Sequence, residues 1–319
     1  DIQSTSQNGG PLAGFRNVLI NGGFETWQRG DGSFIDQFAY TTDRWYLALG
    51  GASVQRFRDL GVPTGNCLQI DSAATIGQLV ELPVANNGDC APGPFMPGTT
   101  WTFSFYSTNS SVSAQTNMSF REGSTDDSPT LISAVTSFTK TGETITGANG
   151  TYTRYSATMT VNSTAVGSNK GMLVTIPAGA GDKITMAQLE PGPVATPFEQ
   201  RPIGTELAMC QRYYQRLVAT NDYTRMCLPG NGTMANTFAT CPFVTSMRAV
   251  PSFTYSSFDD FILEGLTNGS TTEVTGLALN AGSTWNATIA VNGAGASSPG
   301  TGGQLLGWTG GWIAFDAEL

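Results

Sequence analysis

The 319-residue chain contains no histidine. Histidine is the usual general base near neutral pH, and it completes Ser-His-Asp and Cys-His catalytic sites and many zinc sites. The sequence therefore excludes catalysis by these routes and leaves only carboxylate chemistry. We expect a protein that is not an enzyme, with no catalytic residues and no cofactor.

Two acidic dipeptides are the strongest candidates for carboxylate chemistry, Asp126-Asp127 and Asp259-Asp260. A glycosidase needs two carboxylates at a defined distance across a sugar bond. Neighbouring side chains on a strand point to opposite faces, so neither dipeptide is by itself such a pair. Both lie beside Ser, Thr or Phe in segments typical of turns, and we predict solvated loops there.

Aromatic and basic side chains supply the candidate binding residues. Trp27, Trp45 and Tyr46 have two interpretations, as sandwich core or as flat platforms for a ligand. Arg44 lies between an acid and two aromatic residues, an arrangement that favours a pairing that fixes a corner of the fold. A second basic group, Arg201, Arg212 and Arg216, is interpreted as partners of carboxylates, as a subunit interface or as a ligand site.

Five cysteines are present, at positions 67, 90, 210, 227 and 241, and no pair has the C-x-x-C spacing. An odd number without such spacing indicates mostly reduced, small apolar side chains. A bridge between Cys67 and Cys90 remains as the alternative.

The composition restricts the class of partner. Only 12% of the residues are charged and the formal net charge is −9. Nucleic acid and anionic membranes are bound through clustered Lys and Arg, so the sequence disfavours both. No apolar run approaches the ~20 residues of a membrane-spanning helix, and no signal peptide is expected. A neutral glycan carries no such electrostatic penalty.

Short alternating segments dominate the part of the chain that positions these residues. Residues 1–16 are polar and predict an extended amino-terminal arm. From residue 17 to 200, runs such as Thr100–Tyr106 alternate between apolar and polar residues and are separated by turn clusters. This pattern predicts an antiparallel β-sandwich, with Trp101, Phe103 and Phe105 on one face.

A connector at 191–204 holds four prolines, which exclude a central strand. Thr205 is a plausible N-cap for a short helix, with Glu206 in its first turn. Residues 201–319 repeat the β pattern, and we expect the carboxyl end to form part of a sheet. The predicted fold is all-β, with two β-sandwich, jelly-roll-like domains joined by a proline-rich connector and one short helix.

Three segments resemble a group of tailed-bacteriophage virion proteins. They are NVLINGGFETWQRG with the following TTDRWYL, the long segment AQLEPGPVATPFEQRPIGTELAMCQRYYQ, and the FDAEL ending. Because they lie near the start, at the junction and at the end, the resemblance spans nearly the whole chain. The family pattern marks the fold and transfers no catalytic residue to this sequence.

The resemblance implies a virion fibre, spike or decoration protein whose first domain is similar to galactose-binding-like jelly rolls. Such modules often hold a structural calcium through a Glu after the opening N-G-x-F and an Asp on the last strand. Glu25 matches the first position. The expected last strand reads Met186-Ala187-Gln188 and has no Asp.

The leading hypothesis is a non-enzymatic protein, made in the bacterial cytoplasm and exposed on the phage particle as a tail fibre, head fibre or spike. It would bind host cell-surface polysaccharide, contact other virion proteins and form a homotrimer. It would have no nucleic-acid partner and no membrane insertion. The alternatives are a purely structural capsid decoration protein and a polysaccharide depolymerase.

Overall fold

The computed structural model divides the chain into two compact units, Asp1–Glu206 and Leu207–Glu318, which are described separately. The predicted arm falls outside the described residues except for Phe15 and Arg16, and Asp126-Asp127 and Cys90 fall wholly outside them. The structure describes residues 15–318 except 33, 35–38, 50–52, 82–93, 110–111, 113–115, 122–129, 136–137, 162–170, 232–236, 266–270 and 294–301.

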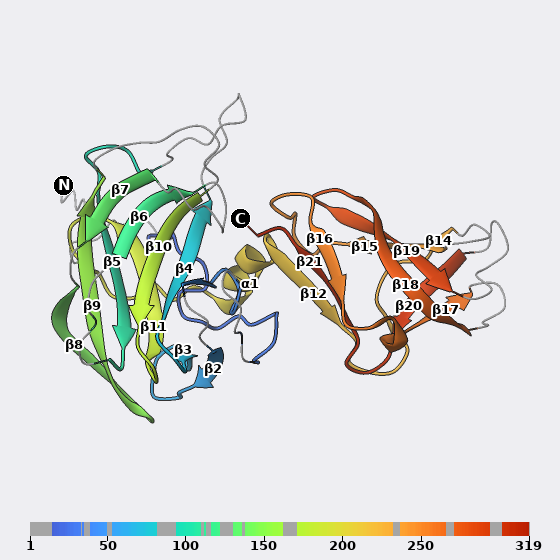
Figure 1. The fold of residues 1–319 in the computed structure, drawn as a ribbon, viewed down its shortest axis with the longest axis horizontal. Coiled ribbons are helices and arrows are strands. Elements are labelled where there is room, and N and C mark those ends of the chain that lie inside the picture. The colour runs from blue at the N-terminus through green and yellow to red at the C-terminus, as the bar shows by residue number, and fades with distance from the viewer. Residues whose placement is uncertain are drawn as a thin grey trace, which may run out of the picture. The chain divides into compact units, whose positions relative to one another are not determined.

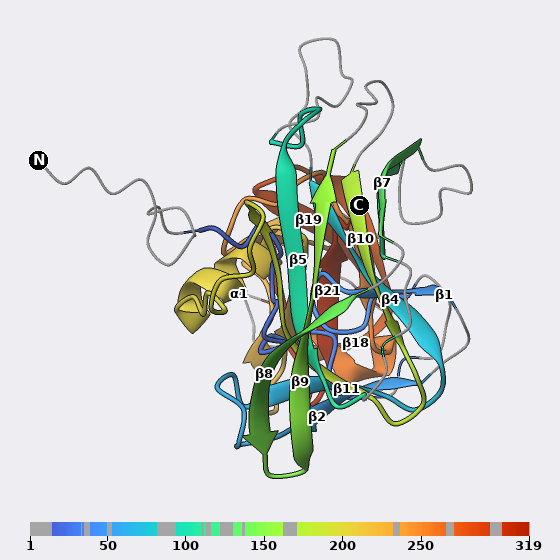
Figure 2. The same ribbon diagram turned by 90° about the vertical axis from the view of Figure 1, so that its left-hand side faces the viewer.

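The first unit is a sandwich of two antiparallel sheets (Figure 1). The five-stranded sheet has the order β1 (Tyr46–Leu49), β4 (Ala74–Glu81), β10 (Gly171–Ala178), β6 (Thr116–Arg121) and β7 (Thr130–Val135). The six-stranded sheet has the order β2 (Val54–Arg58), β3 (Asn66–Ile70), β11 (Lys183–Pro191), β5 (Thr100–Ser107), β9 (Gly150–Thr160) and β8 (Thr139–Gly147). Figure 2 shows β5, β9 and β11 side by side.

Alternation along β5 explains how the first core forms. Trp101, Phe103 and Phe105 are buried in the core cluster, as the sequence pattern predicts. The intervening polar side chains are buried too, because the connector covers that face. The Thr102 hydroxyl donates to the Gly192 carbonyl at 2.7 Å. A strand with a polar outer face is therefore covered on both sides.

Carboxylates fasten the proline-rich connector to the first unit. Glu190 is fully buried and accepts the Thr196 N–H at 2.9 Å and the Gln188 amide at 2.7 Å. Glu199 accepts the Asn17 N–H at 2.8 Å. Because the prolines lack amide donors, side chains such as these take the place of a backbone ladder.

The second unit contains a three-stranded and a seven-stranded antiparallel sheet. The smaller has the order β12 (Tyr214–Val218), β21 (Trp312–Asp316) and β16 (Ser252–Tyr255). The larger has the order β13 (Thr224–Arg225), β20 (Gly302–Gly307), β17 (Phe261–Gly265), β18 (Thr271–Gly282), β19 (Asn286–Gly293) and β15 (Thr237–Pro242), with β14 (Gly230–Asn231) paired to β20. The all-β fold with two sandwiches is confirmed.

Two short helical segments complete the described chain. The α-helix α1 (Ile203–Gln211) carries Glu206 in its first turn, as predicted, but it begins before Thr205, which is therefore not its cap. A 3-10 turn, η1 (Phe258–Asp260), precedes β17. No helix among the described residues is long and apolar enough to span a membrane.

The carboxyl end is built into the smaller sheet of the second unit. β21 pairs with β12 on one side and with β16 on the other. Its Ile313 and Phe315 are buried in the second core cluster. The predicted incorporation of the carboxyl end is thus confirmed.

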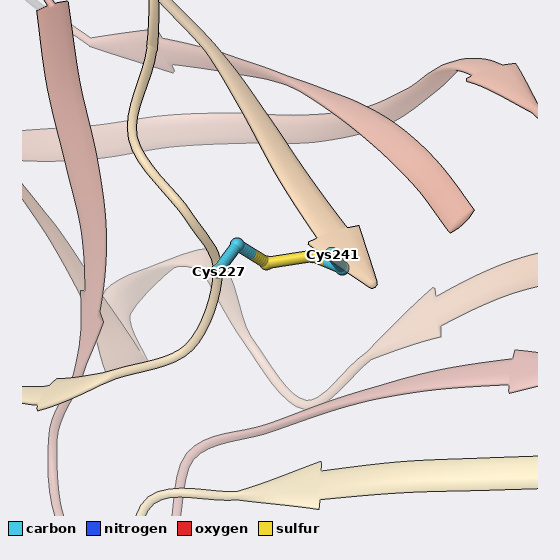
Figure 3. Close-up of a disulfide and its surroundings, with 2 residues drawn as sticks. All are labelled: Cys227 and Cys241. Carbon is cyan, nitrogen blue, oxygen red and sulfur yellow. A yellow bond between two sulfur atoms is a disulfide. The ribbon is translucent and has the colours of Figure 1, made fainter. Parts of the chain in front are cut away.

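The cysteine prediction was wrong in the second unit. A disulfide joins Cys227 to Cys241 of β15, with their Cα atoms 4.6 Å apart (Figure 3). The neighbouring residues Leu228 and Thr240 form an antiparallel bridge, and this pairing brings the two cysteines together. Cys67 and Cys210 are buried thiols. Burial raises the pKa of the Cys67 thiol to about 11, as expected for an unreactive core cysteine.

Candidate ligand-binding pocket

The aromatic residues of the opening motif are core residues. Trp27, Trp45 and Tyr46 are only 8%, 0% and 2% exposed. The Trp45 ring packs against Phe24 at a centroid distance of 5.2 Å, and its indole N–H donates to the Asn21 carbonyl at 3.0 Å. A sugar stacks on an open ring face, which none of the three offers. Their predicted ligand-binding role is therefore corrected in favour of the core interpretation.

Asn21 explains why the two halves of the opening motif occur together. Its side-chain oxygen accepts the backbone N–H groups of Glu25 and Thr26 at 2.9 and 3.0 Å. Its amide nitrogen donates to the Thr42 hydroxyl and the Asp43 carbonyl. Arg44 then donates to the Leu79 carbonyl on β4, so it fixes a corner as the sequence suggested. These hydrogen bonds show that Asn21 and Arg44 position the chain.

Glu25, which matches the calcium position of the resemblance, does not lie in an oxygen cage. Its carboxylate accepts the Gln200 side-chain amide at 3.2 Å, and an amide N–H is a donor that would face a cation unfavourably. The nearby Glu206 is paired with Arg201 at 3.0 Å. The described residues include no group of three or more acidic, His or Cys side chains that could hold a metal. These residues do not fit a calcium site.

The three arginines near the connector have separate environments. Arg201 is buried, pairs with Glu206 and donates to the Leu19 carbonyl at 3.1 Å. The Arg216 guanidinium lies 4.3 Å from the centroid of the Trp312 ring, within the range of a cation–π contact. The Arg212 carbonyl accepts the Arg248 N–H at 2.7 Å. A role of these arginines at a subunit interface stays a prediction.

A pocket of about 590 Å³ lies in the second unit. Its lining residues come from the turn after β12, from η1, from the beginnings of β17 and β18, and from the turn after β20. This volume falls within the range of roughly 300–1,000 Å³ that is usual for small-molecule sites. Four separate stretches of the chain, at residues 223, 258–262, 271–275 and 308, thus converge on one concave surface.

Four aromatic residues line this pocket: Tyr223, Phe258 and Trp308, which are at least partly exposed, and Phe261, which is buried. The Tyr223 and Trp308 rings contact each other with centroids 4.8 Å apart and planes inclined by 56°. Tyr223 remains 55% exposed and Phe258 43% exposed. Unlike the tryptophans of the opening motif, which are almost fully buried, these side chains keep part of their surface accessible to a ligand.

The turn that carries Tyr223 is fastened to the turn that carries Trp308. Tyr223 has a φ of +63°, a left-handed conformation that is uncommon for a bulky residue and that turns the chain sharply. The neighbouring Asp222 accepts the hydroxyl of Thr309 at 2.6 Å and its N–H at 3.0 Å. These hydrogen bonds hold the pKa of Asp222 below its usual value. The aromatic pair is therefore positioned by the polar contacts of its two turns.

The η1 turn places an acidic group at the same pocket. Ser257 caps η1, and its hydroxyl accepts the Asp259 N–H at 3.4 Å. The backbone N–H of Trp308 donates to the backbone carbonyl of Asp260 at 2.8 Å, and this bond joins η1 to the Trp308 turn. Asp259 and, from β18, Glu273 are exposed lining residues. Asp259 thus lies in the short turn that was predicted to be a solvated loop, but it also lines the pocket.

Threonines on β18 add neutral polar groups. Thr271, Thr272 and Thr275 line the pocket beside Glu273. Hydroxyls both donate and accept hydrogen bonds, whereas carboxylates only accept. Exposed aromatic rings can stack on the apolar face of a sugar ring, and the hydroxyl and carboxylate groups beside them can form hydrogen bonds with the sugar hydroxyls.

Sequence reasoning missed this pocket because its residues come from turns. Trp308 precedes Thr-Gly-Gly, and Phe258 precedes Asp-Asp, so both aromatics lie outside an alternating strand pattern. Large aromatic residues within turn-forming segments were a usable signal, because such residues are not needed for a strand core. Which of these turns would meet in space was not readable from the sequence.

The described part of the chain thus defines a two-unit, all-β protein with one aromatic and acidic pocket in its second unit. No family model and no curated protein matches the sequence. Similar solved structures include the CBM22-1–GH10 modules of Clostridium thermocellum endo-1,4-β-D-xylanase 10B complexed with xylohexaose, at 15% identity and a TM-score of 0.27, covering 63% of this chain and 33% of that chain. Another is the CBM22-1–CBM22-2 tandem of Paenibacillus barcinonensis Xyn10C, at 11% identity and a TM-score of 0.27, covering 90% and 96%. With TM-scores this low, neither supports a functional conclusion.

Proposed function

We propose that this chain is a non-enzymatic surface protein of a tailed-bacteriophage particle and that its second unit binds host cell-surface glycan. The particle role rests on the three sequence segments that resemble virion proteins. The glycan role rests on the pocket formed by Tyr223, Phe258 and Trp308 with Asp259 and Glu273. Tail fibre, head fibre and spike are all compatible with these observations.

The open aromatic pair is the single observation that carries the binding proposal. In the first unit, the large aromatic rings of the opening motif are buried in the core. In the second unit, Tyr223 stays more than half exposed although it contacts Trp308. Exposed rings cost free energy in water, so their retention beside polar lining residues supports a role in binding.

Binding is tested with the full chain on an array of bacterial envelope glycans, followed by calorimetry with each glycan that is captured. Tyr223→Ala should weaken binding by about 1–2 kcal/mol, because it removes one face of the aromatic platform. Trp285→Ala is the matched control, since Trp285 is 66% exposed but lies outside the pocket. Equal affinities of the wild type and Tyr223→Ala, or capture of no glycan, would refute binding at this pocket.

Hydrolysis is the competing function, because the pocket holds two carboxylates from different elements. The same incubations are assayed for newly released reducing ends. We expect none. Release that stops in both Asp259→Asn and Glu273→Gln would replace the binding proposal with a polysaccharide depolymerase.

The particle role is tested separately by locating the chain in a reconstruction of the virion that encodes it. Density for both units at a fibre, a spike or a tail tip would support adsorption. Density spread over the capsid surface, together with no glycan binding, would favour the purely structural decoration role.

A further inference from the structure

The pocket in the second unit is acidic as well as aromatic. Asp259 and Glu273 line it, and neither Lys nor Arg is among the described residues that line it. Asp222 and Asp260 flank Tyr223 and Asp259 in the same turns and add negative charge. Arg225 on β13 is the neighbouring basic residue, but it does not line the pocket.

The aromatic rings and the carboxylates of the pocket both favour a positively charged ligand. An aromatic ring presents a negative face and attracts a cation within about 6 Å of its centroid. Carboxylates at the rim of a concave surface create a negative potential that attracts cations and repels anions. The aromatic platform and the acidic rim therefore act together, whereas a carboxylate-bearing sugar would be opposed by both.

The hydrogen-bonding groups also match a cation. The carboxylates of Asp259 and Glu273 offer only acceptors, and the hydroxyls of Thr271 and Thr272 can accept as well. A protonated amine carries three N–H donors and no acceptor, so it is complementary to such a surface. An N-acetyl group would bring one N–H donor, an acceptor and no charge.

We infer that this pocket selects a glycan unit bearing a protonated amine, such as a hexosamine without its acetyl group, over N-acetylated and anionic sugars. The inference rests on the proposed glycan-binding function and adds the class of sugar. The amine lies between Asp259 and Glu273, and the apolar face of the sugar ring stacks on Tyr223 and Trp308.

The test compares three oligosaccharides of equal length by calorimetry: a glucosamine tetramer, an N-acetylglucosamine tetramer and a glucuronate-containing tetramer. Measurements at about pH 5 keep the amines protonated, because α-amino groups titrate at about 7.7–8.0, and the ring oxygens and neighbouring cationic amines of an oligosaccharide lower that pKa further. The glucosamine tetramer should bind about five- to tenfold tighter than its N-acetylated counterpart, from one exposed ion pair and one cation–π contact. The preference should shrink in 0.5 M salt, where the screening length falls to roughly 4 Å.

Isosteric variants assign the preference to the two carboxylates. Asp259→Asn with Glu273→Gln should reduce the preference to the part that the cation–π contact alone supplies. The readout is the ratio of the affinities for the glucosamine and the N-acetylglucosamine tetramers, measured on the same variant. Glu264→Gln, an acid of β17 outside the pocket, should retain the full preference.

The outcomes separate the two proposals. Binding of the N-acetylated tetramer as tightly as the amine, lost in Tyr223→Ala, would overturn the amine preference and leave glycan binding intact. Tightest binding of the glucuronate tetramer would overturn the amine preference as well. A chain that captures no glycan on the array and binds none of the three tetramers would overturn both.

Discussion

Asn21 uses its whole side chain as a structural bracket in the first unit. It is fully buried, and its two polar atoms bind the backbone or side chains of four other residues of the opening motif. Its φ of +57° also places it in a conformation that Asn tolerates better than most residues. Asn is required at this position of the motif because its one side chain forms hydrogen bonds with several buried polar groups at once.

Asn21→Ala should lower the free energy of unfolding of the first unit by about 3 kcal/mol. The change leaves buried N–H and C=O groups without partners, each costing about 1–3 kcal/mol, and places Ala at positive φ. Urea unfolding followed by tryptophan fluorescence measures the loss. Asn280→Ala, at an exposed position of β18, is the control and should change stability by less than about 0.5 kcal/mol. A similar effect of the two substitutions would contradict the bracket role.

Asp59 gives the first unit a predictable response to acid. Burial raises the pKa of its carboxyl group, but hydrogen bonds from the Ala148 and Gly61 N–H groups, the Tyr152 hydroxyl and the Asn149 N–H outweigh this effect and bring the pKa below its usual value. The Asp59 carboxylate accepts the Ala148 N–H at 2.7 Å and the Tyr152 hydroxyl at 3.0 Å. These contacts fasten the β8–β9 turn to the end of β2.

Because the folded-state pKa of Asp59 is depressed, its contribution to stability is present above the unfolded value of about 3.9 and is lost as the pH falls through the folded value. The free energy of unfolding of the first unit should therefore decrease as the pH falls below about 4. Urea titrations across this range measure the slope. Asp59→Asn should flatten it, and an unchanged slope in that variant would show that other carboxylates dominate.

At the level of strands and turns, the disulfide fastens the segment that follows the pocket. Cys227 lies just after β13, which itself follows the Tyr223 turn, and Cys241 lies in β15. β13 is only two residues long, so backbone pairing alone holds it weakly. The covalent link compensates for this short strand.

Replacing Cys227 and Cys241 together by Ser should lower the free energy of unfolding of the second unit by about 3 kcal/mol. The bridge closes a loop with a sequence separation of 14, and loops of about 15 residues are stabilised by roughly this amount. Calorimetric unfolding with and without reductant measures the effect. Reductant should not change the unfolding free energy of the double variant. If reductant also left the unfolding free energy of the wild type unchanged, this would argue against a stabilising bridge.

The strand patterns show how far local sequence predicted the architecture. Period-2 alternation identified β5 and β9, because a strand covered by a core buries every second side chain. It failed on the polar face of β5, where Thr102 and Ser104 are buried as well. The connector covers that face. Its Gly192 carbonyl accepts the Thr102 hydroxyl across a sequence separation of 90 residues, and its Thr196 carbonyl accepts the Arg154 side chain of the adjacent strand β9.

For the molecule as a whole, a single pocket would bind a glycan only weakly, and adhesion to a cell surface would gain from several copies. We predict a homotrimer, because linked sites raise the effective affinity without new contacts. Light scattering at micromolar concentration should give three times the chain mass of 33.5 kDa. A mass of one chain at that concentration would contradict the prediction, and a dimer would require a different symmetry.

The amino-acid sequence was sufficient for the all-β class, the apolar face of β5, the incorporation of β21 into a sheet and the absence of histidine chemistry. These properties follow from composition and from the period of side chains along a strand, which are local. The pairing of Cys227 with Cys241, the burial of Trp45 and the meeting of Tyr223 with Trp308 depended on the folded chain. Each requires segments far apart in sequence to come together, because a turn residue becomes part of a core or a pocket only through the neighbours that the fold brings to it.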